Sequence, residues 1–340
     1  MNGKHGYPII LAHGITRPDY LIDFIIRKLN LHEDSRVADR LHYFKGIASH
    51  LRRHGYEVFA TSVSFAADVD TRARELAAQV RKILAETGQP KVHLIGHSMG
   101  GLDARHMIVQ HGMADQVASL TTLGTPHLGA SVADWFLEFG LTRIIESLRK
   151  VINLEGFQSL TTAACREFNA SARNAEASNS VIYQTYAGWQ RRELTFFPFQ
   201  KTWQITYARE GDNDGLVAVT SQRWQDRLVA DDGTTKLIVQ RDFPVPADHV
   251  NQMGWWHLNG VAAAHWWKRG TWREKRNYEL AIKNAYLKIA AEISGFPCHE
   301  HEPQRQRPAP TSASDGGHAL PRLPIAGDAP SSPSSNQNGT

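Results

Sequence analysis

The sequence predicts an α/β protein whose mostly parallel sheet is covered by helices on both faces. Three short apolar runs, at residues 9–12, 57–61 and 92–95, have the length of buried strands. The segments between these runs repeat their apolar residues every three to four positions, which is the period of an amphipathic helix. Strands that alternate with helices are joined by crossovers, so they build a parallel sheet between two helical layers.

The individual helices and strands follow from the same periodicity. Helices are expected over residues 37–51 and 76–87, and each is followed by a glycine, Gly55 or Gly88, where a helix commonly ends in a left-handed residue. The later expected elements are strands at 117–123, 203–207 and 236–239 and a helix from about 274 to 293.

The regular alternation breaks in the middle of the chain and again near its end. Residues 131–200 contain an apolar-rich helical stretch at 132–152, then small and polar residues, then the aromatic cluster 196–199. We therefore expect a cap or lid inserted over about 131–200 into one domain that spans residues 1–296. Residues 297–340 are rich in Pro, Ser, Gly, Asn and Gln, which predicts a disordered tail.

Composition and charge limit the classes of function. The net charge of +4 comes from basic residues that are scattered along the 340-residue chain, whereas a nucleic-acid partner needs a concentrated basic stripe. No stretch of about 18 apolar residues occurs, so no transmembrane segment is expected and lipid contact would be interfacial. The run at residues 9–12 is too short for a signal-peptide core, which predicts a cytoplasmic protein and leaves another export route open. Pairing of the two cysteines, Cys165 and Cys298, is left open.

A G-x-S-x-G pentapeptide at residues 96–100 carries the strongest chemical signal. A strand runs directly into this pentapeptide, and a helix-compatible segment follows it. Such a strand, turn and helix form a nucleophile elbow, which raises a serine hydroxyl at the start of the helix. Side chains at Gly96 and Gly100 would collide in this bend. We therefore predict Ser98 as the nucleophile of an acyl-transfer reaction.

Acyl transfer also needs N–H donors for the oxyanion that forms at the carbonyl group. The Met99 amide is predicted to supply one donor, because it opens the helix after the elbow. The second is expected from the Ile15 amide, since Gly14 lets the loop after the first strand turn inward. We expect His13 to tie this loop down by hydrogen bonds, and His97 to serve packing.

In the fold that a nucleophile elbow indicates, the acid follows the serine in the sequence and precedes the histidine. A polar turn at residues 211–217 offers Asp212 and Asp214. Asp214 is preferred because Gly215 and the apolar residues after it would anchor it, while Asp212 could make an Asx-type turn. Its role would be to accept the Nδ1–H of the base.

The base is predicted to be His249, which lies in a proline-rich loop after a strand. His257 and His265 fall among tryptophans, which indicates packing. Asp103, on the helix after the elbow, and Asp248, beside the predicted base, are expected to have structural roles.

Together these motifs resemble the bacterial triacylglycerol lipases of the α/β-hydrolase fold. The resemblance covers roughly residues 7–295, with 130–205 poorly matched. It implies Ser98, Asp214 and His249 as the triad and the Ile15 and Met99 amides as the oxyanion hole. The motifs that carry it are Tyr7-Pro-Ile-Ile-Leu-Ala-His-Gly14, Tyr43-Phe-Lys-Gly-Ile47, Gly96-His-Ser-Met-Gly-Gly101, Thr125-Pro-His-Leu-Gly129, Asp214-Gly-Leu-Val217 and Asp248-His-Val-Asn-Gln252.

The resemblance implies a carboxylic-ester hydrolase, a lipase that cleaves acylglycerols through an acyl-enzyme and needs no cofactor. It also implies a structural calcium held by aspartates, but Asn251 and Gln252 stand after the predicted base here, so no metal is expected. The metal-ligating residue types at 298–302 are expected to be a solvated charge cluster. The helix at 132–152 could cover the site and open on a lipid surface, or be an ordinary core helix.

Two other functions are compatible with the same motifs. The first is an esterase or acyltransferase that acts on short-chain or soluble acyl substrates, because one triad serves any acyl acceptor. The second is a catalytically silent binding protein with a hydrolase fold.

Overall fold

The computed structural model divides the chain into two units, Met1–Cys298 and His299–Thr340. The second unit lies outside the described residues, as do the predicted boundary at residue 296 and the predicted tail, so both stay predictions. Within the first unit the structure describes residues 6–14, 43–64, 67–139, 154–255 and 269–295.

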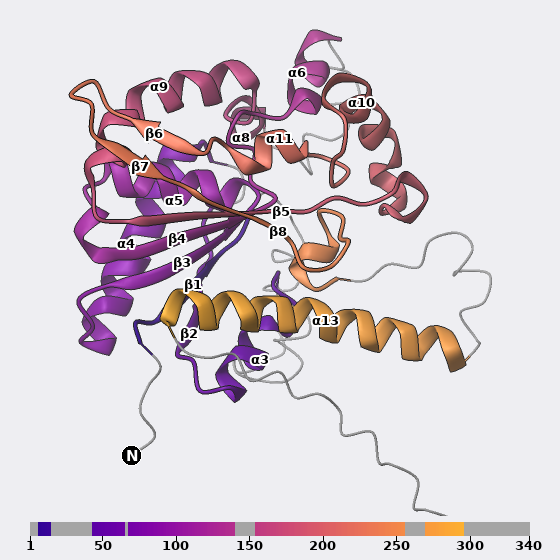
Figure 1. Cartoon of the computed structure of the whole chain (residues 1–340), viewed down its shortest axis with the longest axis horizontal. Helices are drawn as coiled ribbons and strands as arrows, with labels where there is room; N and C mark the ends of the chain where they lie inside the picture. The colour runs from indigo at the N-terminus through magenta and orange to yellow at the C-terminus, as the bar shows by residue number, and fades with distance from the viewer. Residues whose placement is uncertain (1–5, 15–42, 65–66, 140–153, 256–268, 296–340) are drawn as a thin grey trace, which may run out of the picture. The chain divides into compact units, whose positions relative to one another are not determined.

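A six-stranded sheet forms the centre of the first unit (Figure 1). Its strands follow the order β2-β1-β3-β4-β5-β8, and every neighbouring pair is parallel. A separate antiparallel pair is formed by β6 (Arg227–Val229) and β7 (Thr235–Leu237). The six strands are β1 (Ile9–Ala12), β2 (Val58–Ala60), β3 (Val92–His97), β4 (Val117–Leu123), β5 (Ile182–Ala187) and β8 (Val239–Asp242).

Helices cover both faces of this sheet, as the sequence predicts. Helices α3 (Ile47–Arg53) and α13 (Arg269–Ser294) lie on one face, and α4 (Val69–Thr87) and α5 (Met99–Gln110) lie on the other (Figure 1). None of the helices among the described residues is long and apolar enough to cross a membrane. The remaining helices are α6 (Ser131–Glu138), α8 (Leu154–Gln158), α9 (Thr162–Ser178), α10 (Gln200–Glu210) and α11 (Val219–Arg223).

Strand β1 shows why the sheet needs helices on both faces. Ile10 packs in one core with Leu76 of α4 and Met107 of α5. Leu11, its neighbour, packs in a second core with Ile289 of α13. Successive side chains of a strand point to opposite faces, so a wholly apolar strand is buried only between two helical layers.

Several predicted elements are confirmed, with ends that differ by a few residues. The strands expected at 9–12, 57–61, 92–95 and 117–123 correspond to β1, β2, β3 and β4. The strand expected at 236–239 falls across the end of β7 and the start of β8. Gly55 and Gly88 take the positive φ angles, 89° and 65°, that were expected after α3 and α4.

The strand predicted at residues 203–207 is wrong, because this segment lies in helix α10. Its aromatic residues favour a strand locally, but in the helix Trp203 and Tyr207 stack with ring centroids 4.6 Å apart. Residues four apart lie on the same face of a helix, so this contact stabilises the helical alternative.

The predicted insertion over 131–200 needs a second correction. Strand β5 lies inside this range and pairs with β4 on one side and β8 on the other. Residues 182–187 therefore belong to the central sheet and not to a cap. Of the helix predicted at 132–152, α6 forms the first part, and residues 140–153 lie outside the described residues.

Burial of His93 predicts a loss of stability in acid. Burial lowers the pKa of this side chain, which bonds Ser119 Oγ on β4, from 6.5 to about 4. The unfolded chain therefore takes up a proton between pH 6.5 and pH 4 that the folded chain refuses, so the free energy of unfolding falls as the pH falls through this window. We expect the wild type to lose up to about 2 kcal/mol more than His93→Asn between pH 7 and pH 4.5.

Urea denaturation of both proteins at the two pH values measures this difference. Asparagine keeps a polar group beside Ser119 but does not titrate, so the other histidines cancel in the comparison. Equal losses in the two proteins would show that His93 titrates normally.

Candidate active site

Ser98 lies between β3 and α5 in a strained backbone conformation. Its φ is 57° and its ψ is −131°, and in the described part of the chain the only other non-glycine residue with a positive φ is Trp224. The Ser98 N–H donates to the Leu123 carbonyl at 2.9 Å, and Thr125 Oγ1 donates to the Ser98 carbonyl at 2.9 Å. The end of β4 and the loop after it therefore hold this strained bend in place.

The close packing around the bend requires glycine at both predicted positions. A Cβ atom on Gly96 would lie 2.8 Å from the backbone of α5, and one on Gly100 would overlap the Ala12 carbonyl oxygen. Gly14 passes so near that a Cβ atom there would lie 2.6 Å from Ser98 Cβ. The loop after β1 therefore runs against the predicted nucleophile.

The two predicted oxyanion donors differ in what the structure describes. Met99 is the first residue of α5, so its N–H has no acceptor within the helix. Ile15 lies outside the described residues, and its role stays a prediction. The loop just before it is fixed, because Arg72 Nη2 donates to the His13 carbonyl at 3.0 Å and the Val63 N–H donates to His13 Nε2 at 3.1 Å. His13 thus ties the loop down, as expected.

Asp214 and His249, which are 35 positions apart in the sequence, are hydrogen-bonded side by side. The distance between His249 Nδ1 and Asp214 Oδ2 is 2.7 Å, and the His249 N–H donates to the Asp214 carbonyl at 2.9 Å. The Asp214 carboxylate is fully buried, and its Oδ1 accepts the N–H groups of Leu216 and Val217 at 3.0 and 2.8 Å. These bonds fix the carboxylate so that it can hold the imidazole in one orientation.

The His249 ring lies beside the elbow. Its centroid is 4.6 Å from that of His97, the residue just before Ser98. Among the described residues, no hydrogen bond joins the Ser98 hydroxyl to His249. Catalytic hydrogen bonds of this kind commonly tighten only when substrate binds.

Burial distinguishes the two candidate acids in the turn at residues 211–217. Asp212 is exposed, whereas Asp214 is buried against the histidine. The Asx-type turn expected of Asp212 is made by Asn213, whose Oδ1 accepts the Gly215 N–H at 2.8 Å. Asn213 performs this role because its side chain is the buried one.

Asp103 and Asp248 have the structural roles that were expected. Asp103 forms a buried ion pair with Arg72, at 2.6 Å between Oδ2 and Nη2, and burial raises the pKa of Asp103 to about 6. Asp248 Oδ1 accepts the N–H groups two and three residues further on, and its Oδ2 accepts the Phe196 N–H. Within the described ranges, neither carboxylate is hydrogen-bonded to the His249 ring.

The side chains after His249 do not fit the calcium site that the family resemblance implies. Asn251 Nδ2 donates to the Trp255 carbonyl, and Gln252 Nε2 donates to Asp214 Oδ2. These bonds turn amide N–H groups, which repel a cation, toward the available oxygens. In the described ranges, no cluster of three or more His, Cys, Asp or Glu side chains could hold a metal ion.

Several other predicted candidates lie outside the described residues, namely His257, His265, Cys298 and the cluster 298–302. Cys165 is buried, its thiol donates to the Pro126 carbonyl at 3.4 Å, and burial raises its pKa to about 11. A thiol held in this state is a poor nucleophile.

Sequence reasoning missed two buried glutamines at the site. Gln252 donates to Asp214, and Gln222 bonds the backbone of Gly188 and Val217. Gln252 stands three residues after the predicted base, so its place in the sequence was the signal that could have found it. Gln222 gave no such signal.

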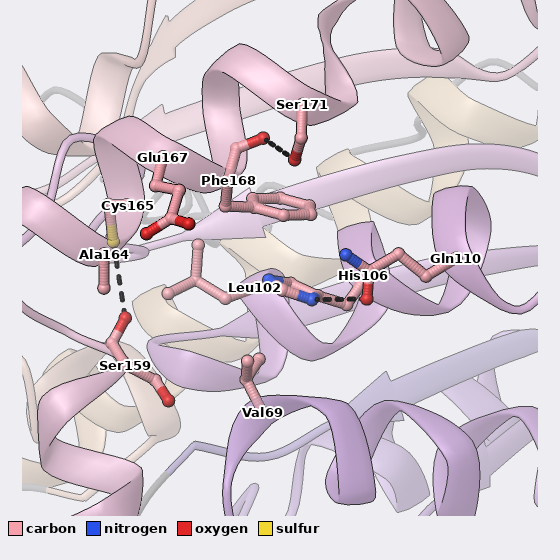
Figure 2. A pocket seen from close by; sticks show the side chains of 10 residues that line it. All are labelled: Val69, Leu102, His106, Gln110, Ser159, Ala164, Cys165, Glu167, Phe168 and Ser171. Carbon is pink, nitrogen blue, oxygen red and sulfur yellow. Dashed lines mark hydrogen bonds between the residues drawn. The ribbon is translucent and has the colours of Figure 1, made fainter.

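A cavity of about 270 Å³ lies along the flank of α5 (Figure 2). The His106 ring of α5 stacks on the Phe168 ring of α9, with centroids 3.6 Å apart, in its wall. Neither Ser98 nor Asp214 nor His249 lines it, so this cavity is separate from the candidate catalytic residues. Its lining residues are Val69, Leu102, His106, Gln110, Ser159, Ala164, Cys165, Glu167, Phe168 and Ser171.

Comparison with known proteins identifies a matching family model and several similar proteins. Residues 7–196 match a family model described as alpha/beta hydrolase fold. The chain is 28% identical to triacylglycerol lipase 2 of Saccharomyces cerevisiae over 324 residues. This alignment covers 84% of this chain and 91% of the yeast protein. It is 39% identical to a triacylglycerol lipase of Pseudarthrobacter phenanthrenivorans over 133 residues. This alignment covers 38% of this chain and 36% of that lipase.

Among solved structures, a metagenomic carboxyl esterase superposes with a TM-score of 0.54. The match covers 84% of this chain and 77% of the other, at 18% sequence identity. At this identity the likeness concerns the fold alone.

The geometry predicts that Ser98 reacts with a fluorophosphonate probe and that Asp214 controls the rate. We expect no labelling of Ser98→Ala and labelling of Asp214→Asn that is at least about 100-fold slower than in the wild type, because the histidine loses its orienting carboxylate. Asp212→Asn is the matched control, since its side chain is exposed two residues away.

Mass spectrometry of the labelled peptide and the time course of labelling give both results. Equal labelling rates in Asp214→Asn and Asp212→Asn would show that Asp214 does not act as the acid of the site.

Proposed function

The chain belongs to the alpha/beta hydrolase fold family, and from this membership we propose that it is a serine ester hydrolase that cleaves acylglycerols. Its relation to triacylglycerol lipases makes it a hydrolase of the lipase and esterase family. Ser98 is the nucleophile, His249 the base and Asp214 the acid. The observation that carries this proposal is the buried bond between His249 Nδ1 and Asp214 Oδ2, next to a serine on a strained bend.

The reaction proceeds in two halves. His249 Nε2 takes the Ser98 hydroxyl proton as Oγ attacks the ester carbonyl carbon, and the imidazolium then gives this proton to the departing alcohol. The ester C–O bond breaks and an acyl-enzyme forms. Water, activated by the same imidazole, then attacks the acyl carbon and releases the carboxylic acid and the serine.

Charge develops on the carbonyl oxygen in both halves of the reaction. The Met99 amide at the start of α5 is one donor to this oxyanion, and the Ile15 amide is the second. The Met99 donor needs no reorientation during the reaction, because it is part of the helix backbone. Asp214 stabilises the imidazolium and keeps Nδ1 protonated.

Exposed apolar side chains favour a lipid substrate over a dissolved one. Helices α6 and α10 pack against each other at the same end of the unit (Figure 1), and Arg209 of α10 bonds Glu138 of α6 at 2.8 Å. Phe139, at the end of α6, is 61% exposed, and Phe197, just before α10, is 77% exposed. Aromatic groups at the surface of neighbouring elements are suited to contact with a lipid interface.

This reasoning predicts that Phe139→Ser/Phe197→Ser weakens hydrolysis of emulsified long-chain triacylglycerol but not of a dissolved short-chain ester. The loss on the emulsion should be about tenfold or more, because each aromatic ring contributes of order 1.5 to 3 kcal/mol when it leaves water. Initial rates on both substrates, with Ser98→Ala as the blank, measure the effect.

Leu237→Ser/Leu280→Ser is the control pair, because these side chains are also exposed but lie on β7 and α13. Equal losses for both pairs, or none on the emulsion, would favour an esterase or acyltransferase for soluble substrates. Equal rates for the wild type and Ser98→Ala on every ester would leave a silent binding protein.

A further inference from the structure

We propose that Gln252 is a positioning residue, whose carboxamide sets how strongly Asp214 holds the proton on His249. This inference rests on the proposed function, since it concerns the same acid and base. It adds a fourth member to the site, one that acts through the acid and does not touch substrate.

Gln252 and His249 bond the same carboxylate oxygen. Gln252 Nε2 lies 3.2 Å from Asp214 Oδ2, and His249 Nδ1 lies 2.7 Å from it. The Gln252 side chain is fully buried, so water does not compete for this oxygen. A second donor on one oxygen draws negative charge away from the bond to the imidazole.

Two glycines make the room that the Gln252 carboxamide occupies. A Cβ atom on Gly124, after β4, would lie 2.6 Å from Gln252 Oε1, and one on Gly188, after β5, would lie 2.5 Å from Gln252 Nε2. The backbone is fixed as well, because the Gln252 N–H donates to Asp248 and its carbonyl accepts from Tyr286 at 2.9 Å. The carboxamide is therefore held at the ends of two central strands.

The surroundings decide which way this carboxamide points. Asp214 Oδ2, which accepts from His249, is a carboxylate oxygen and can only accept hydrogen bonds. The N–H group of Gln252 therefore faces it, and Oε1 faces away. Oε1 is buried with no hydrogen bond of normal geometry within the described residues, and the same holds for His97 Nε2. Oε1 is an acceptor, and His97 Nε2 is a donor when it carries the ring proton.

Burial and neighbouring groups decide the protonation of His97. Burial lowers the pKa of His97 well below its ordinary value and the neighbouring His249 lowers it further, so the ring is neutral. The His249 backbone opposes this lowering of the pKa of His97, and the Gln252 side chain opposes it to a smaller extent. Tyr43 Oη lies 2.8 Å from Nδ1, so a donated Tyr43 hydroxyl leaves the ring proton on Nε2.

Tyr43 Oη is hydrogen-bonded to His97 Nδ1, and Gln252 Nε2 donates to Asp214 Oδ2. Among the described residues, no hydrogen bond of normal geometry joins His97 Nε2 to Gln252 Oε1. The titratable groups packed around His249 include His97 on β3, Asp214, and Asp248 in its own loop. Of these, Asp214 alone is hydrogen-bonded to the His249 ring in the described part of the chain.

Loss of the Gln252 donor has a direction that can be measured. Without it, Oδ2 carries more negative charge and holds the Nδ1–H more strongly, so the imidazolium becomes more stable. The acid limb of kcat/KM then moves to higher pH. The carboxylate also loses one of its fixed bonds, so kcat falls while KM for a small ester stays nearly the same.

The test compares Gln252→Met with Gln184→Met on a dissolved short-chain ester. Gln184 is also buried, but its side chain bonds Glu292 and not the site. We expect kcat of Gln252→Met to fall by about 10- to 100-fold, as for other partners that orient a functional ligand. The acid limb should rise by about half a pH unit or more, and Gln184→Met should leave it unchanged. An acid limb that stays in place in Gln252→Met would overturn the inference.

A second pair of variants serves if Gln252→Met does not fold. Gln252→Leu also removes the donor to Asp214 and should raise the acid limb, whereas Gln252→Asn retains an N–H group and should restore it. Equal acid limbs in these two variants would also overturn the inference. A wild type that hydrolyses esters and labels at Ser98, with unmoved acid limbs in the variants, refutes only the role of Gln252. A wild type that does neither refutes the proposed function with it.

Discussion

The buried hydrogen bond between Asp214 and His249 is the contact on which the candidate site depends. It exists because a parallel sheet brings the carboxyl ends of its strands to one edge, where loops far apart in the sequence meet. Ser98 follows β3 and His249 follows β8 at this edge. Two backbone amides after Asp214 orient its carboxylate, so the site is built on fixed main-chain groups.

Much of this arrangement could be predicted from the sequence, because its signals are local. The strand at 9–12 is apolar without interruption, and the pentapeptide around Ser98 has a strand before it and a helix after it. Chain order then limited the acid to residues after Ser98 and the base to residues after the acid. The structure contains the hydrogen bond between Asp214 and His249. The role of this pair as the acid and base of catalysis is the proposal.

The remainder could not be predicted, because tertiary contacts decide it. Strand β5 includes the polar residues Gln184 and Thr185, so its sequence does not have the apolar pattern of a buried strand. It is nevertheless buried between β4 and β8. The segment 203–207 has strand-forming residues, yet it is helical because aromatic residues four apart stack. The position of Gln252 three residues after His249 does not by itself give its role, since that role depends on the space that Gly124 and Gly188 leave beside the carboxylate.

A crystal structure of the protein after reaction with an alkyl phosphonate ester tests the central claim most directly. The account predicts phosphorus bonded to Ser98 Oγ, a phosphoryl oxygen within hydrogen-bond distance of the Met99 amide, and His249 Nε2 within reach of Oγ while Nδ1 keeps its bond to Asp214. An adduct on another residue, or an adduct on Ser98 with the His249 ring out of contact, would contradict it.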